Sequence, residues 1–175
     1  MQHLSVRRGW NVALLAVGLF LAAPPARAVW PFDSSDGPDP VRDPGGAAAQ
    51  ILSRAIRIKT VNPPGDEKPL AEFLVEVLRA EGVEAEVIDT PSGSSELGRG
   101  AVWARVKGNG RKRPVILHSH LDVVPANPAE WVVPPFEGLV GGGHVVGRGA
   151  LDAKGITVVQ LLALIQIARR DTPLD

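Results

Sequence analysis

A histidine and an aspartate, His120 and Asp122, follow directly after a short apolar run near the middle of this chain. The run lies within residues 114–118 and has the character of a buried central strand. Residues two apart on a strand share a face, so the imidazole and the carboxylate are expected to lie side by side. In open α/β sheets ligands bind at the carboxyl ends of the strands, and this pair falls at such an end.

A second carboxylate, Asp152, comes thirty positions after Asp122, inside the glycine-flanked sequence GRGALDAKG. An imidazole, a neighbouring carboxylate and a distant carboxylate at one strand edge together indicate a metal site. The chain contains no cysteine, so histidine and carboxylate groups must hold any metal, which suits a catalytic site better than a structural one. A dinucleotide-binding fingerprint is excluded, because Asp152 occupies the place of its third glycine.

Three motifs in this order resemble the metal-binding core of peptidase family M20, a family of zinc-dependent peptidases and amidohydrolases. They are HSHLDVVP at 118–125, W-x-x-P-P-F-x-G at 131–138 and GRGALDAKG at 147–155. The upstream sequence IKTVNPPGDE at 58–67 is also similar to the N-terminal region of the family. The resemblance covers residues 47–175 and only the front part of a family member.

The resemblance implies a role for each of the three side chains. His120 matches the first zinc ligand, Asp152 the carboxylate that bridges two zinc ions, and Asp122 the carboxylate that accepts the other N–H of the imidazole. Co²⁺ or Mn²⁺ are alternatives to Zn²⁺. Two metals about 3.5–4 Å apart would bind one water between them and polarise a substrate carbonyl. The resemblance also implies a cis peptide bond after Asp152.

The implied reaction is hydrolysis of an amide bond next to a free carboxylate, in a small peptide or an N-acyl amino acid. The carboxypeptidase or aminoacylase type is expected first, and a deacylase or desuccinylase of N-acyl amino acids is the alternative. In the family a glutamate that serves as general base comes at a later position than Asp175. The chain alone is therefore expected to be inactive, and a truncated, non-catalytic product that binds metal or peptide is the rival reading. Any homodimer would form through a lid or dimerisation domain that is absent here.

Residues 1–28 have the three parts of a secretory signal peptide. Arg7 and Arg8 form the basic region, 11–23 is apolar, and an A-x-A site predicts cleavage after Ala28. The apolar run is shorter than the roughly 20 residues that span a bilayer, so no stable membrane anchor is expected. These features predict an exported protein, periplasmic or secreted, with an uncleaved anchor as the alternative.

The remaining sequence divides into a linker and one domain. Residues 29–46 are rich in Pro, Gly and Asp and predict a flexible linker, and residues 47–175 form the N-terminal part of an M20-like catalytic domain. The element pattern and the resemblance imply an α/β fold with a mixed open sheet flanked by helices. Charges are balanced, at 19 basic and 19 acidic residues, so no nucleic-acid partner is expected.

Periodicity predicts the elements that must position the site. Helices are expected around 51–56 and around 70–78, the second with Asp66 as N-cap and Gly82 as its stop. Strands are expected at 84–89, 101–107 and 114–118. An Asn-Gly turn is expected to join the second strand to the third.

Two further elements are expected near the C-terminal end. A small hairpin should form around the glycine run 141–143. Residues 155–170 are apolar nearly all round, which predicts a helix buried on most faces, although the chain contains little else to bury it.

Overall fold

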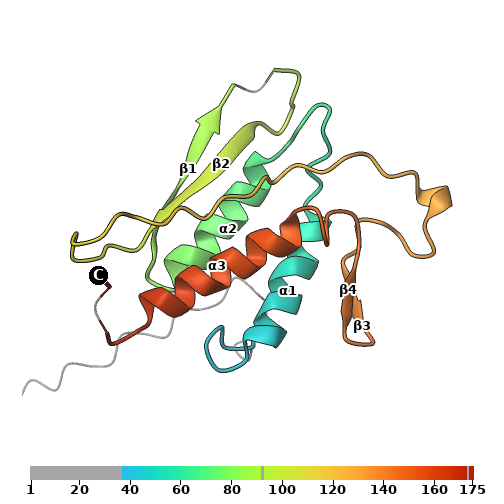
Figure 1. Ribbon diagram of the computed structural model, residues 1–175. Helices are drawn as coiled ribbons and strands as arrows, with labels where there is room; N and C mark the ends of the chain where they lie inside the picture. The colour runs from blue at the N-terminus through green and yellow to red at the C-terminus, as the bar shows by residue number, and fades with distance from the viewer. Residues whose placement is uncertain (1–36, 92, 173) are drawn as a thin grey trace, which may run out of the picture.

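The computed structural model describes residues 37–91, 93–172 and 174–175 (Figure 1). Within these residues the chain forms three α-helices and two separate antiparallel strand pairs, so the predicted α/β class is confirmed. The predicted signal peptide, 1–28, lies outside the described residues, as do residues 29–36 of the predicted linker. In the described part, no helix has both the length and the apolarity needed to cross a membrane.

Helix α1, Pro44–Arg57, begins within the last residues of the predicted linker. The fixed φ of proline suits the first turn of a helix, and the Asp43 carboxylate caps that turn by accepting a hydrogen bond from Gly46 N at 2.9 Å. The apolar residues that repeat along α1 face the core, with Ile51 and Ile56 fully buried.

Helix α2, Lys68–Ala80, buries the predicted apolar stripe: Leu70, Phe73, Leu74, Val77 and Leu78. Gly82, at φ +75°, follows its end as expected. The predicted N-cap was wrong. Glu67 occupies that position, because the Asp66 carboxylate turns to the loop instead and accepts a hydrogen bond from Ser95 Oγ at 2.5 Å.

Strands β1, Glu84–Thr90, and β2, Arg99–Arg105, pair antiparallel with Val87 opposite Val102. The pair packs against α2 (Figure 1). Strand β2 therefore pairs with the strand before it, and its predicted pairing with residues 114–118 was wrong.

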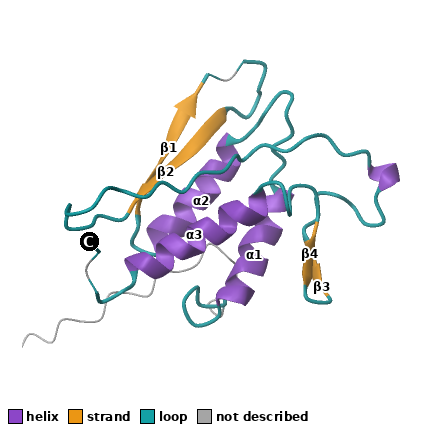
Figure 2. Ribbon diagram, viewed as in Figure 1, coloured by secondary structure: helices purple, strands orange, loops and turns teal. Residues whose placement is uncertain are grey.

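Residues 114–118 do not form the predicted buried strand. Val115 is 86% exposed and Ile116 83% exposed, and no strand of the described part of the chain pairs with this segment. A central strand gains its stability from neighbours on both edges and cover on both faces, and the described residues supply neither. Figure 2 shows that the long connection from β2 to β3 is loop apart from the short 3₁₀ helix Pro128–Glu130.

The C-terminal hairpin matches the prediction, whereas the last helix matches it only in part. Strands β3, Leu139–Gly141, and β4, His144–Val146, form the predicted hairpin. Helix α3, Lys154–Ala168, forms where expected, but it is buried on one face only, since Val159 is 58% exposed. The expectation of burial on most faces was wrong for the described residues, because α1 and the core cover α3 from one side (Figure 1).

The core lies between the three helices and the inner face of the β1–β2 pair. Its buried apolar members are Ala47, Ile51, Ala55, Leu70, Phe73, Leu74, Val75, Val77, Leu78, Val83, Ala85, Val158, Leu161, Leu162 and Ile165. This core fixes α1 and α3 relative to each other, and the candidate site is built where these two helices meet the connection that follows β2.

Candidate metal centre

The segment around residues 118–123 carries His120 and Asp122 over the first turns of α3. Ser119 Oγ lies 2.9 Å from Thr157 Oγ1, and Gln160 Nε2 donates to the His118 carbonyl at 3.2 Å. These contacts hold the segment on α3, and Asp152 lies just before the start of that helix. An extended conformation without a sheet is therefore enough to bring the two sequence motifs together.

A short stretch after α1 secures the other side of the same segment. Asn62 N donates to the Val123 carbonyl and Val123 N to the Thr60 carbonyl, each at 2.9 Å, which makes a single parallel bridge between Val61 and Val123. The buried Thr60 hydroxyl donates to the Leu121 carbonyl at 2.7 Å. The backbone on both sides of Asp122 is thus fixed by hydrogen bonds to residues 60–62.

The imidazole of His120 lies between two carboxylates. Its Nδ1 is 3.0 Å from Asp122 Oδ1 and 3.0 Å from the Asp122 carbonyl, and its Nε2 is 2.9 Å from Asp152 Oδ1. The expectation that His120 and Asp122 lie side by side is confirmed, and the structure adds Asp152 to the same cluster. The peptide bond from Asp152 to Ala153 is cis, as the resemblance implied.

The electrostatics of the cluster follow from these contacts. The hydrogen bond to Asp152, followed by the contacts to Asp122, raises the pKa of His120 above its usual value. The hydrogen bond from Asn62 Nδ2, with the neighbouring His120, lowers the pKa of Asp122. When the ring carries both protons, Nδ1 donates to Asp122 and Nε2 to Asp152, so a metal at Nε2 would have to displace the Nε2 proton.

The donors fit a metal such as zinc in kind and in spacing. Imidazole nitrogen and carboxylate oxygen are zinc ligands, and two ligands about 2.0 Å from one tetrahedral zinc lie about 3.3 Å apart. Nε2 of His120 and Oδ1 of Asp152 are 2.9 Å apart, and the Asp152 side chain is 89% exposed and free to adjust. Throughout the described ranges, no three His, Cys, Asp or Glu side chains converge closely enough to hold a metal ion. Of the candidate ligands, the described residues bring two together, His120 and Asp152.

Two residues of this region were not predicted from the sequence. Asn62 donates through Nδ2 to Asp122 Oδ2 at 2.9 Å, and Lys154 donates through Nζ to the carbonyls of Ala55 and Ile58 at 2.8 and 2.7 Å. Burial lowers the pKa of Lys154 to about 8. The sequence offered only a weak signal for Asn62, its place in the family-like segment 58–67, and the adjacent prolines were interpreted there as a helix break.

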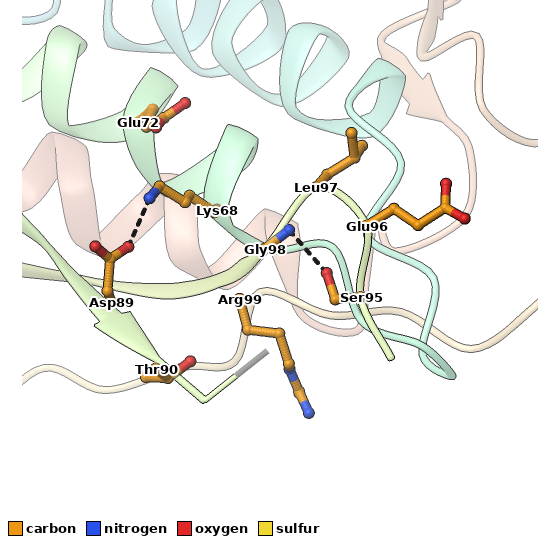
Figure 3. Close-up of a pocket in the computed structure, with 9 residues that line it drawn as sticks. All are labelled: Lys68, Glu72, Asp89, Thr90, Ser95, Glu96, Leu97, Gly98 and Arg99. Carbon is orange, nitrogen blue, oxygen red and sulfur yellow. Dashed lines mark hydrogen bonds and ion pairs between the residues drawn. The ribbon is translucent and has the colours of Figure 1, made fainter. Parts of the chain in front are cut away.

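A pocket of about 460 Å³ lies elsewhere, between the start of α2, the end of β1 and the loop before β2 (Figure 3). Two of its charged side chains pair with each other, Lys68 Nζ with Asp89 Oδ1 at 2.8 Å. None of the three candidate site residues lines it. The candidate centre is therefore separate from this pocket. Its three side chains are partly or largely exposed at the surface.

Comparison with known proteins agrees with the motifs. Residues 116–174 match the model of peptidase family M20/M25/M40. A succinyl-diaminopimelate desuccinylase of Paracoccus denitrificans (strain Pd 1222) is 35% identical over 138 residues, covering 78% of this chain and 32% of the relative. Aminoacylase-1 of Dictyostelium discoideum is 31% identical over 122 residues, covering 69% and 28%.

A third curated relative and a solved structure also match this chain. An N-fatty-acyl-amino acid synthase/hydrolase PM20D1 of Mus musculus is 50% identical over 52 residues, covering 30% of this chain and 10% of the relative. The crystal structure of human carnosine dipeptidase 1 shares the fold with a TM-score of 0.59, at 23% identity, covering 74% of this chain and 30% of that one.

Together these matches confirm the resemblance, and the chain carries a peptidase family M20/M25/M40 region. The chain spans at most 32% of the length of the three curated relatives. Their names describe enzymes that act on acylated amino compounds, while the dipeptidase supports the fold alone.

Proposed function

We propose that this protein is a zinc-dependent hydrolase of amide bonds, with His120 and Asp152 as metal ligands and Asp122 as the group that orients His120. The observation that carries the proposal is the placement of one imidazole between two carboxylates, inside the region that matches the family. The names of the relatives, a desuccinylase and an aminoacylase among them, support amide hydrolysis.

The residues of this chain have distinct tasks in such a reaction. With Asp122 accepting the Nδ1–H of His120, Nε2 is the nitrogen that would bind a metal, in place of its contact with Asp152. Asp152 supplies a charged oxygen that is exposed to solvent and so can meet both metal and substrate. A zinc ion bound there would lower the pKa of a bound water and polarise the amide carbonyl.

The proposed substrates are N-acyl amino acids and small peptides in which a free carboxylate lies next to the scissile amide. N-acyl amino acids are favoured, because the names of three kinds of relative refer to succinyl, acyl or fatty-acyl groups on amino compounds. The second metal ion, bridged by Asp152, belongs to the same proposal.

The test uses the full product of the gene and a panel of N-succinyl, N-acetyl and dipeptide substrates. We expect hydrolysis that a zinc chelator abolishes and added zinc restores, with no measurable turnover in His120→Ala and Asp152→Ala. Asp122→Asn should reduce activity by about 10- to 100-fold, the usual cost of losing a group that orients a ligand. His144→Ala is the matched control, since this exposed histidine contacts only the hairpin carbonyl of Gly142 in the described structure. Undiminished turnover in His120→Ala would disprove the assignment.

Export belongs to the proposal as well. The three-part pattern of residues 1–28 supports a mature protein that begins at Val29 and lies in the periplasm or outside the cell. N-terminal sequencing of the protein recovered from the periplasmic and culture fractions tests this, and an intact residue 1 would count against cleavage.

A further inference from the structure

Asn62 makes two contacts with the segment that carries the candidate ligands. Its backbone N–H donates to the Val123 carbonyl and its side chain donates to Asp122 Oδ2, both at 2.9 Å. The backbone contact does not depend on the side chain, and the neighbouring Thr60 makes two more hydrogen bonds to the same segment. The side chain of Asn62 is therefore not needed to hold residues 121–123 in place.

The Asn62 side chain instead fixes the orientation of the Asp122 carboxylate. Asp122 Oδ1 is 3.0 Å from His120 Nδ1, while Oδ2 accepts from Asn62, so each oxygen has a different partner. Rotation of the carboxylate about its last bond would cost one of these contacts. With both in place, Nδ1 carries the proton toward Asp122 and Nε2 faces Asp152.

The amide group suits this position for an electrostatic reason. A neutral donor fixes the carboxylate but leaves its negative charge available to the imidazole N–H. A lysine or arginine would compete with His120 for that charge, and an aspartate would repel it. The half-buried setting, with the Asp122 side chain 32% exposed, limits replacement of the amide by water.

We propose that Asn62 is a positioning residue of the candidate centre: it fixes the Asp122 carboxylate and, through it, the Nδ1–H tautomer and the ring orientation of His120. The proposal rests on the proposed function, because a metal would bind Nε2 of the ring that is oriented in this way, in place of the contact between Nε2 and Asp152. The hydrogen-bond chain runs from Asn62 through Asp122 and His120 to Asp152.

The test reads the tautomer directly, by long-range ¹H–¹⁵N correlation spectra of the histidine rings in the metal-free chain, at a pH where His120 is neutral. In the parent chain we expect the Nδ1–H form to predominate. In Asn62→Leu the ratio of the Nδ1–H to the Nε2–H form should fall several-fold, and zinc affinity in a titration should fall by less than the roughly 10- to 100-fold that is typical of losing a group bonded directly to a ligand. Asn109→Leu is the matched control, because that exposed amide donates to the Asp175 side chain and accepts from Arg111 N, away from the candidate centre.

A double-mutant comparison separates positioning from a general structural effect. In an Asp122→Ala background, Asn62→Leu should leave the tautomer ratio unchanged, because the group through which it acts is gone. An equal change in both backgrounds, or none in the parent, overturns the proposal. If Asn62→Leu does not fold, Asn62→Ala removes the donor without adding a charge, and the same decrease in the tautomer ratio is expected. A zinc titration that leaves the His120 signals of the parent unchanged would refute the proposed function alone, since the tautomer comparison contains no metal.

Discussion

His120 shows how much a site depends on which atom faces which partner. Its two ring nitrogens each face one carboxylate, so the tautomer, and not only the residue type, decides whether Nε2 is free for a metal. Asp122 supplies the asymmetry, because its second oxygen is already held by Asn62. At this scale the candidate centre is a chain of directed hydrogen bonds rather than a group of acidic residues.

Lys154 supports the other half of the site. Its side chain is 1% exposed, and its Nζ donates to two carbonyls at the end of α1, so the residue that opens α3 is joined to α1 directly after Asp152. Lys154→Met keeps the length and apolar body of the side chain but leaves the Ala55 and Ile58 carbonyls without this donor. We expect a loss of about 1–3 kcal/mol in the free energy of unfolding, measured by urea denaturation.

The control for that substitution is Lys107→Met, because the Lys107 side chain is 66% exposed and its ion pair with Glu84 lies at the surface. A change within about 0.5 kcal/mol is expected there. Equal effects of the two substitutions would show that the buried hydrogen bonds of Lys154 contribute nothing to stability.

At the scale of elements, the ends of α2 and α3 are joined by a buried charge pair. Glu81, just after α2, has a side chain only 1% exposed and pairs with Arg169, just after α3. Arg169 also reaches Asp39 Oδ1 at 3.2 Å, so the segment before α1 joins the same network. The pair therefore ties the C-terminal end of α3 to the end of α2, at the opposite end of the helix from Asp152.

The pKa of Glu81 gives this pair a pH dependence. Burial raises the pKa of Glu81 above its usual value even though Arg169 opposes the shift, so the folded state holds the proton more tightly than the unfolded state does. The contribution of Glu81 is therefore most favourable below its unfolded pKa of about 4.3, and it declines as the pH rises through the folded pKa. At neutral pH the buried carboxylate depends on Arg169.

Arg169→Ala should accordingly destabilise the chain most at neutral pH. We expect a loss near the lower end of about 3–5 kcal/mol at pH 7, because Arg169 is itself partly exposed, and a smaller loss at pH 4, where Glu81 is protonated more often. Urea denaturation at both pH values measures it, with Arg170→Ala, an exposed neighbour, as control. A loss that is larger at pH 4 than at pH 7 would contradict this account of the pair.

At the scale of the whole molecule, the described residues bring together two of the proposed metal ligands and leave large apolar side chains in water. Val115, Ile116 and Val159 are each more than half exposed, and the chain spans at most 32% of the length of the three curated relatives described above. We therefore predict that the purified 175-residue chain has no hydrolase activity by itself. An assay with the full substrate panel checks this, and hydrolysis that a chelator abolishes would disprove it.

The same chain should still show the behaviour of its two donors. Titration with zinc is expected to shift the ring signals of His120, weakly but specifically, and to leave those of His144 in place. The assay and the titration together separate a chain that lacks catalytic groups from one that does not fold.

Local patterns were enough to predict much of this molecule. The spacing of apolar residues in α1, α2 and α3, the glycine-rich hairpin and the site motifs around His120 and Asp152 are properties of short stretches, which neighbouring residues define. The family was also predictable at this level, because its motifs consist of consecutive residues.

Other features depend on which distant segments meet, and no short stretch contains that information. Residues 114–118 have the composition of a buried strand, yet they stay extended and exposed because the described chain provides no partner strand. Asn62 and Lys154 act across 60 and about a hundred positions, through side chains whose partners only the packing of α1 on α3 brings within reach. Hydrogen bonds of this kind have no periodicity, so tertiary contact alone selects them.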